Sequence, residues 1–294
     1  MIAAFAILAG NAPATPTGYG VRPSAAALAK ACEGRDGWSD PAPPAHIFGN
    51  TWYVGTCGIT VLLITSPKGH VLIDGGPADA APLVAANVEK LGFALKDVRW
   101  VIASHEHHDH VGGTAELQRL TGARVAALRE QAAVLKTGKL TAEDPQLKIA
   151  EDFAPVTVGK ILQAGGKLKL GQLVLTATAT PAHSPGSTSW TWQSCEGRIC
   201  RTVAYADSAS TISADGYRFT AHPEREQAIR RGLAAIAGLP CDILLTPHPS
   251  ASSMFERFSG AQPLVPDHAC RTYAKTALER FEARLERERQ GIEP

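Results

Sequence analysis

Hydrophobic residues in the first half of the chain occur in short runs that are separated by glycine, proline and polar residues. Such runs predict strands, and they cover residues 51–55, 59–66, 70–76, 98–104 and 124–128. Apolar residues at helical spacing predict helices over residues 25–32, 79–91, 114–120 and 129–136. Strands therefore follow one another directly in some places and alternate with helices in others.

The second half repeats this plan after a mixed, polar segment at 137–160, which we expect to form a loop. Strands are predicted at 167–180 (a hairpin-like pair), 189–194, 202–208 and 241–247, and helices at 223–237 and 267–290. This pattern favours the α/β class, with two mixed sheets packed face to face and helices outside, a four-layer αβ/βα sandwich. The charge-dense residues 282–289 indicate a solvated face of the last helix.

Composition narrows the function classes. The 294 residues include 29 Lys and Arg against 28 Asp and Glu, a formal charge of +1, and 45% of them are hydrophobic. Near-zero charge argues against a nucleic-acid partner held by bulk charge. The length allows one or two domains. Because the two halves are similar, we expect one domain over residues 15–294, and we expect it to be a monomer.

The N-terminus resembles the end of a secretory signal. Residues 1–10 are apolar and uncharged, and Ala12-Pro13-Ala14 follows, so residues 1–14 are interpreted as a signal remnant. The alternative is a disordered chain end. No other run approaches the ~18 apolar residues that span a membrane, so no membrane partner is expected. The predicted location is periplasmic or secreted.

The cysteines support export. Six cysteines allow fifteen pairings, and their order along the chain suggests Cys32–Cys57, Cys195–Cys200 and Cys241–Cys270. The alternative is six buried free thiols in a cytosolic enzyme.

Histidines and acids cluster directly after a buried strand, in His105-Glu106-His107-His108-Asp109-His110. His105 and His107 point the same way if the backbone is extended. Asp109 and His110 follow where the chain turns through two glycines into a helix. This spacing can direct two imidazoles at one metal ion, and a carboxylate with an imidazole at a second. Two isolated histidines, His183 and His248, also follow apolar strands.

Three segments together resemble the metallo-β-lactamase superfamily: the His-x-His-x-Asp-His run at 105–110, the run Thr180-Pro181-Ala182-His183-Ser184-Pro185-Gly186-Ser187, and His248 after a strand. The likeness covers nearly the whole chain. It is strongest to class B β-lactamases of the third subclass, because His110 and Ser208 stand where other subclasses carry a different residue and a zinc-binding cysteine. Cys241–Cys270 matches a disulfide common in that subclass.

The resemblance implies two Zn²⁺ ions per chain. Zinc 1 would be held by His105, His107 and His183, and zinc 2 by Asp109, His110 and His248. It implies a hydrolase that opens the β-lactam ring of penicillins, cephalosporins and carbapenems by metal-bound hydroxide and so confers antibiotic resistance. Asp109 would be the catalytic residue that orients the hydroxide.

Further roles follow for residues around this site. Ser208 and Ser210 can donate hydrogen bonds to the substrate carboxylate or to a zinc-bound water; the alternative is that they only form a turn after a strand. Asp74 is expected to orient the ligands. Glu106 is interpreted as a solvated acid. Trp38 and Phe153 lie in loops that can line the cleft, whereas Tyr53, Trp190 and Trp192 are expected in the core. These last five assignments come from the residues alone.

Two other functions stay open. The first is a glyoxalase-type thioesterase or a lactonase on the same scaffold, because many of those enzymes use an aspartate that bridges the metals, and Asp207 lies close to that position. The second is a zinc-binding or interaction protein without catalysis.

Overall fold

The computed structural model describes residues 23–292. The expected signal remnant at 1–14 lies outside the described residues and stays a prediction.

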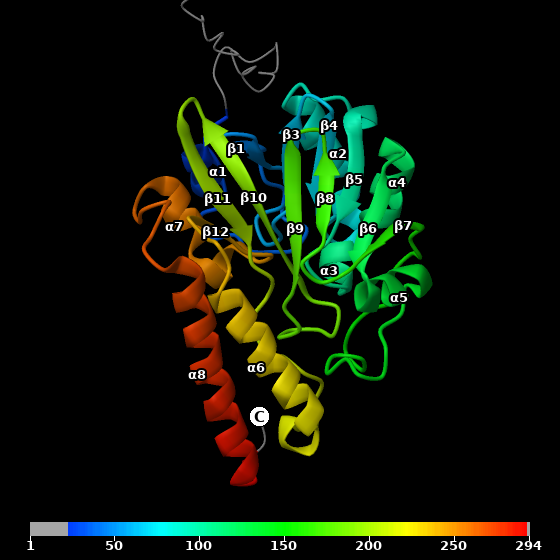
Figure 1. The fold of residues 1–294 in the computed structure, drawn as a ribbon, viewed down its shortest axis with the longest axis vertical. Coiled ribbons are helices and arrows are strands. Elements are labelled where there is room, and N and C mark those ends of the chain that lie inside the picture. The colour runs from blue at the N-terminus through cyan, green and yellow to red at the C-terminus, as the bar shows by residue number, and fades with distance from the viewer. Residues whose placement is uncertain (1–22, 293–294) are drawn as a thin grey trace, which may run out of the picture.

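The first sheet contains seven strands in chain order (Figure 1). They are β1 (Ala45–Phe48), β2 (Thr51–Tyr53), β3 (Leu62–Ser66), β4 (Gly69–Ile73), β5 (Val98–Ile102), β6 (Arg124–Leu128) and β7 (Val158–Leu162). Pairs from β1 to β4 are antiparallel, and pairs from β4 to β7 are parallel. The predicted mixture of a meander with alternating strands and helices therefore lies within this one sheet.

The second sheet contains five strands in the order β12-β11-β10-β9-β8. They are β8 (Lys167–Leu170), β9 (Leu173–Ala179), β10 (Thr188–Glu196), β11 (Ile199–Tyr205) and β12 (Ile243–Leu245). Only the β11–β12 pair among these is parallel. Both sheets are therefore mixed, as the sequence predicted.

The two sheets pack face to face, and helices cover their outer faces. Side chains from both sheets, such as Ile64, Val71, Trp190 and Val203, share the central hydrophobic core. The first sheet packs its other face on α2 (Ala81–Lys90), α4 (Thr114–Thr121) and α5 (Arg129–Thr137). The second packs on α6 (Pro223–Ala237) and α8 (Ala269–Arg289), which lie side by side (Figure 1). The predicted four-layer αβ/βα sandwich is confirmed.

Four short elements were not predicted from the sequence pattern. These are β1, the one-turn helix α3 (His108–Val111) inside the histidine cluster, β7 at the end of the expected loop, and α7 (Met254–Ser259). Helix α1 (Ala25–Ala31) was predicted to within one residue. Each of these four has only four to six residues and no clear period, whereas the predicted strands of similar length stand out as apolar runs between turn residues.

The last helix is only in part the solvated face that its charge density predicts: Glu286, Arg287 and Arg289 are exposed, but two charged residues are not. Arg284 and Glu288 are buried, and the Arg284 Nε lies 3.0 Å from the Glu288 Oε1. Arg284 also donates to the Thr211 carbonyl and, over 2.7 Å, to the Ser213 Oγ. Charge density alone was misleading, because a paired arginine that binds a loop can be buried. Tyr53, Trp190 and Trp192 lie in the core as predicted.

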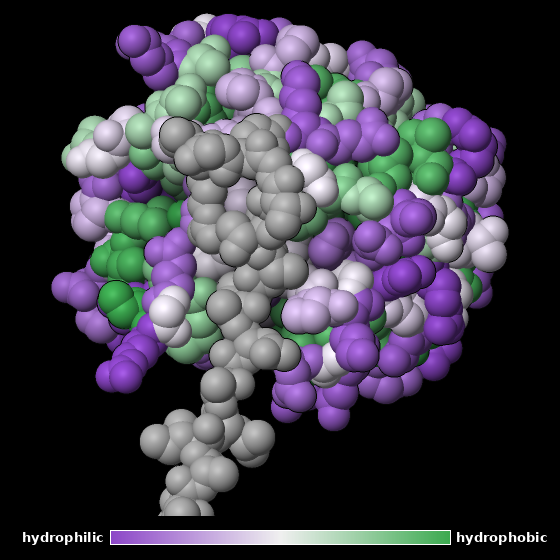
Figure 2. All heavy atoms as spheres, turned by 90° about the horizontal axis from the view of Figure 1, so that it is seen from above, coloured by the Kyte–Doolittle hydropathy of each residue, from purple (hydrophilic) through white to green (hydrophobic). Residues whose placement is uncertain are grey.

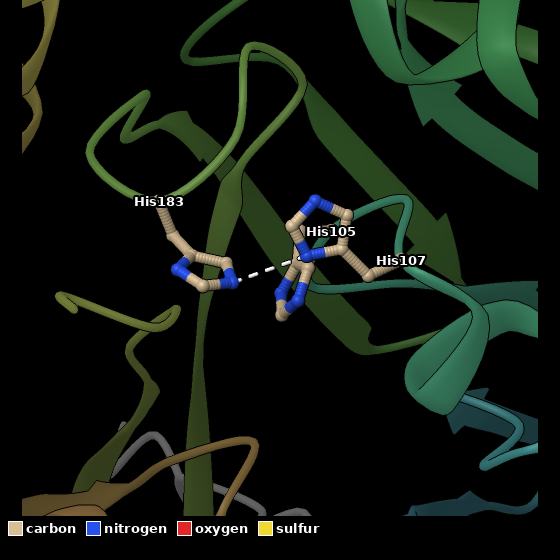
Figure 3. A group of neighbouring side chains, drawn as sticks. All are labelled: His105, His107 and His183. Atoms are coloured by element: carbon tan, nitrogen blue, oxygen red, sulfur yellow. Dashed lines mark hydrogen bonds between the residues drawn. The ribbon is translucent and has the colours of Figure 1, made fainter. Parts of the chain in front are cut away.

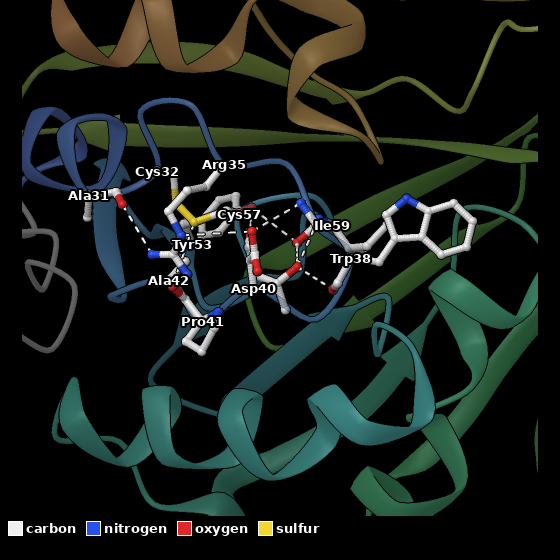
Figure 4. Close-up of a disulfide and its surroundings, with 12 residues drawn as sticks. Ala31, Cys32, Arg35, Trp38, Asp40, Pro41, Ala42, Tyr53, Cys57 and Ile59 are labelled. Carbon is white, nitrogen blue, oxygen red and sulfur yellow. Dashed lines mark hydrogen bonds and ion pairs between the residues drawn. A yellow bond between two sulfur atoms is a disulfide. The ribbon is translucent and has the colours of Figure 1, made fainter.

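All six cysteines form the predicted disulfides, Cys32–Cys57, Cys195–Cys200 and Cys241–Cys270. The first joins α1 to the turn after β2 and lies beside the loop that carries Trp38 (Figure 4). The second links β10 and β11 within their hairpin. The third fixes the start of α8 next to β12.

No helix among the described residues is long and apolar enough to cross a membrane. On the face seen from above, hydrophilic side chains surround small groups of hydrophobic ones (Figure 2). This mixture is normal for a protein surface in contact with water.

Loss of the Cys241–Cys270 bond should destabilise the protein more than loss of the Cys195–Cys200 bond. The first closes a loop with a sequence separation of 29, and the second closes one of 5. Loop-closure entropy then gives losses of about 3.5 and about 2 kcal/mol for the paired Cys→Ser variants. Urea unfolding of the two variants and the unaltered protein measures the difference. Equal losses, or cysteines that alkylate without a reductant, would contradict it.

Candidate metal centre

The carboxyl ends of strands from both sheets meet at one edge of the sandwich, and the candidate site lies there (Figure 1). Residues 105–110 follow β5, His183 follows β9, and His248 follows β12. Asp74 and Asp207 directly follow β4 and β11. Residues far apart in the sequence are therefore held by rigid elements around a common point.

His105, His107 and His183 form the first group (Figure 3). One ring nitrogen from each lies within 4.8 Å of the others. The His107 Nδ1 faces the His183 Nε2 at 3.1 Å. All three residues are buried. The structure thus brings the three ligands expected for zinc 1 to one point.

Asp109, His110 and His248 form the second group. The Asp109 Oδ2 lies 3.0 Å from the His110 Nε2 and 3.3 Å from the His248 Nε2. The two histidine Nε2 atoms are 3.2 Å apart. The rings of His105 and His110 have centroids 4.2 Å apart, so the two groups are neighbours. The His248 side chain is 28% exposed and is the part of this group that faces solvent.

Each buried histidine of the two groups binds an acceptor with one ring nitrogen and points the other into the cluster. The outward contacts are His105 Nδ1 to Asp207 Oδ1 (2.8 Å), His107 Nε2 to Asp144 Oδ2 (3.0 Å), His110 Nδ1 to Asp74 Oδ2 (3.2 Å) and His183 Nδ1 to the Ser210 carbonyl (2.8 Å). An acceptor on one nitrogen fixes the proton there and leaves the lone pair of the other free for a metal.

The residues present fit a metal ion. The His105 Nε2 is buried and has no hydrogen-bond partner among the described residues, although its other nitrogen is held by Asp207. A buried polar atom without a partner is costly unless something else satisfies it. Imidazole nitrogens with one carboxylate are the donor set that suits zinc.

Asp74 connects much of this framework. Its carboxylate accepts hydrogen bonds from the Ser104 N–H at 2.6 Å, the Ser104 Oγ at 2.8 Å and the Tyr205 hydroxyl at 2.7 Å, besides its contact with His110. Its backbone φ of 67° lies in the left-handed region, which aspartate tolerates better than most residues. Asp74 therefore lies where the sequence analysis expected a residue that orients ligands.

Burial and neighbouring charges shift the pKa values of the histidines and of Asp109 in different directions. Burial and the neighbouring imidazoles hold the pKa of His105 well below its usual value. Burial opposes ionisation of Asp109, but His110 and His248 hold the pKa of that carboxyl far below its usual range. Burial also opposes the charge of His110, yet Asp109 and Asp74 raise its pKa to about 10. The carboxylates that stabilise the protonated form of His110 would also stabilise a metal cation. A metal ion and the second ring proton therefore compete for His110.

Glu106 was expected to be a solvated acid, and this prediction is wrong. Its side chain is 1% exposed, and its Oε1 accepts the Gly186 N–H at 2.7 Å. A Cβ added to Gly186 would lie 2.5 Å from the Glu106 Oε2 and 2.7 Å from the Gln131 backbone. Glu106 is buried because it connects the histidine cluster with the loop that carries His183.

Trp38 and Phe153 were candidates for either the cleft or the core, and only Trp38 lies beside the histidines of the site. Its ring centroid lies 5.6 Å from that of His108 and 6.0 Å from that of His248, and the residue is 45% exposed. The Thr56 hydroxyl donates to the Trp38 carbonyl at 2.7 Å, next to the disulfide in Figure 4. Phe153 instead packs against the helix-covered core of the first sheet.

Ser208 and Ser210 lie at the edge of the cluster, where the Ser210 Oγ is 3.1 Å from the His183 Nδ1. Together with His248 they line a cavity of about 910 Å³ that continues along one face of α8. Ser208 is buried, whereas Ser210 is exposed and also supplies the carbonyl that binds His183.

Asp144 and Gln146 also contact the histidines, although neither was predicted from the sequence. Both lie in the segment expected to be a loop, and the Gln146 Nε2 is 3.2 Å from the His183 Nε2. Neither residue follows a predicted strand, which was the signal that identified the others.

Comparison with known proteins agrees with this geometry. The sequence profile of the metallo-β-lactamase superfamily matches residues 54–196. The metallo-β-lactamase MIM-1 from Novosphingobium pentaromativorans is 59% identical, with a TM-score of 0.88 over 90% of this chain and 98% of that one. MEM-A1, a subclass B3 metallo-β-lactamase from a soil metagenome library, is 39% identical, with a TM-score of 0.82 over 87% of this chain and 100% of that one.

Curated relatives are more distant. A hydroxyacylglutathione hydrolase from Rhodopseudomonas palustris (strain BisB5) is 34% identical over 122 residues, 42% of this chain and 38% of that protein. The chain thus matches well under half the length of this relative, whereas it covers nearly all of MIM-1. The chain therefore belongs to the metallo-β-lactamase superfamily, in which it resembles the subclass B3 enzymes.

Proposed function

We propose that the cluster binds two zinc ions. Zinc 1 takes His105, His107 and His183, and zinc 2 takes Asp109, His110 and His248. The proposal is supported by the inward direction of the free ring nitrogens and by the partnerless Nε2 of His105. Three protein ligands per ion leave positions open for water and substrate, as a catalytic site requires.

We further propose that this centre hydrolyses the β-lactam ring of penicillins, cephalosporins and carbapenems, and so gives resistance to them. The observation that carries this proposal is the match to MIM-1 over 98% of that lactamase at 59% identity. When bound, the two ions supply Lewis-acid polarisation of the carbonyl and lower the pKa of water.

The protein groups have distinct tasks in this reaction. Asp109 is the catalytic residue: its carboxylate, kept ionised by His110 and His248, accepts a hydrogen bond from the attacking water and orients it. Asp74 and Asp207 hold His110 and His105 in the tautomers that present Nε2 to the site. Because these rings are buried and fixed from behind, little reorganisation accompanies the reaction.

Substrate binding is assigned to Ser208 and Ser210. β-Lactams carry a carboxylate next to the ring that opens, and hydroxyl groups are suitable donors to it. Both serines line the cavity that contains His248, so a carboxylate bound there lies beside the second group of ligands. Trp38 supplies an exposed apolar ring at the same edge.

The thioesterase or lactonase alternative rests on the hydroxyacylglutathione hydrolase match. In that alternative an aspartate bridges the two metals, and Asp207 is the nearest candidate. Its Oδ1 instead contacts the His105 Nδ1, the ring nitrogen opposite the one that faces the cluster. The contacts of Asp207 therefore favour the lactamase.

Export to the periplasm or the exterior completes the proposal. Three disulfides join all six cysteines, and such bonds persist mainly in oxidising compartments.

Purified zinc-loaded protein should open a chromogenic cephalosporin, a penicillin and a carbapenem. Removal of metal with a chelator should abolish hydrolysis, and added Zn²⁺ should restore it. The reason is that the ions activate the attacking water and no protein nucleophile offers another route. Spectrophotometric rates with each β-lactam, a thioester of glutathione and a lactone measure the preference. Protein that cleaves the thioester or lactone but leaves all β-lactams intact would replace the proposed activity by the alternative.

His248→Ala should remove zinc 2 while zinc 1 stays bound. We expect one zinc per chain in place of two, and a fall in kcat/KM of at least about 100-fold. Elemental analysis of freshly dialysed protein gives the metal count. His222→Ala is the control, since that ring is exposed and stacks on Tyr217. Near-normal turnover by His248→Ala would refute the ligand assignment.

A further inference from the structure

Asp144 reaches the cluster from a long loop and not from a segment that follows a strand of either sheet. It lies between α5 and β7, in a segment that is mostly exposed. Of residues 139–155, only Asp144 and Pro145 are buried, and Asp144 is 3% exposed. A carboxylate buried in an otherwise solvated loop is costly unless it is paired, so its partner indicates its role.

Both oxygens of the Asp144 carboxylate are engaged. Its Oδ2 lies 3.0 Å from the His107 Nε2, and its Oδ1 accepts the Gln146 N–H at 2.8 Å. The second bond fixes the side chain against its own loop, so the first holds His107 at a defined place.

His107 is turned the opposite way from the other buried histidines. His105, His110 and His183 bind their outer partners through Nδ1, whereas His107 binds Asp144 through Nε2 and presents Nδ1. This orientation requires the proton on Nε2. Without an acceptor at that position, neither the tautomer nor the ring direction of His107 would be specified.

The loop that carries Asp144 is tied to the other loop over the site. The Ala214 N–H donates to the Pro145 carbonyl at 2.9 Å. That second loop also contains Ser210, whose carbonyl binds the His183 Nδ1. Both His107 and His183 thus depend on loops that contact each other, whereas His105 and His110 are held by acids at strand ends.

We infer that Asp144 is a positioning residue that fixes the Nε2–H tautomer of His107 and thereby sets the affinity of the protein for zinc 1. The inference rests on the ligand set proposed above. It also makes the loop at 139–155 part of the metal centre, because a displacement of this loop moves the acceptor away from His107.

Zinc affinity of metal-stripped Asp144→Ala, Asp144→Asn and unaltered protein, measured by competition with a chromophoric chelator, tests the inference without any β-lactam. We expect Asp144→Ala to bind zinc 1, and so one of its two zinc ions, about 10 to 100-fold more weakly. Asp144→Asn should recover part of the loss, since an amide oxygen can still accept from Nε2–H. Asp152→Ala is the matched control, because this acid of the same loop is 65% exposed and pairs with Lys139.

A second measurement separates positioning from general stability. Nitrogen-15 NMR of histidine-labelled protein should show the His107 Nε2–H tautomer in the unaltered protein and its loss in Asp144→Ala. Unaltered zinc affinity with an unchanged His107 tautomer in Asp144→Ala would overturn the inference. If Asp144→Ala fails to fold, the isosteric Asp144→Asn decides: it must show weakened zinc binding, and wild-type affinity would refute the role. Absence of β-lactam hydrolysis by zinc-loaded protein counts only against the proposed function.

Discussion

The structure depends on the burial of several carboxylates beside several imidazoles in one water-poor pocket. Asp74, Asp109, Asp144 and Asp207 are all buried, each within hydrogen-bonding distance of a histidine. Such an arrangement is expensive to form, and breaking any one pair leaves a charge without compensation. The acids and rings together define a space that favours cations. In each buried ring one nitrogen donates to an acceptor behind it and the other presents its lone pair to this space.

The scaffold makes this arrangement possible by directing the ends of strands from two sheets to one edge. Asp74 shows the coupling most clearly. It follows β4 and binds both Ser104, which lies between β5 and the histidine cluster, and the hydroxyl of Tyr205 on β11. A shift of one sheet against the other would break these contacts at once. The loops add the remaining contacts: Asp144 from one and the Ser210 carbonyl from another. The strand ends provide rigidity, and the loops complete the side of the site that substrate must enter.

Much of the fold followed from the sequence, because strands and helices of sufficient length show their period. Strands 70–76 and 98–104 were placed correctly, and the polar residues after them identified the edge that carries the site. The proposed ligands were found because His105, His107 and His110 are dense in the sequence and His183 and His248 follow strands. Asp144 has neither signal; its contact with His107 is set by the path of a loop, which no local pattern encodes. Glu106 was misjudged for a related reason, since a charged residue between histidines gives no indication that Gly186 will cover it.

If two zinc ions share this pocket with the ligands assigned to them, anomalous X-ray diffraction from zinc-loaded crystals at the zinc absorption edge will locate both. Two peaks roughly 3.5–4 Å apart are expected. One should lie about 2.0–2.1 Å from the His107 Nδ1, together with His105 and His183, and the other beside Asp109, His110 and His248. A single peak, or a pair bridged by Asp207, would contradict this assignment.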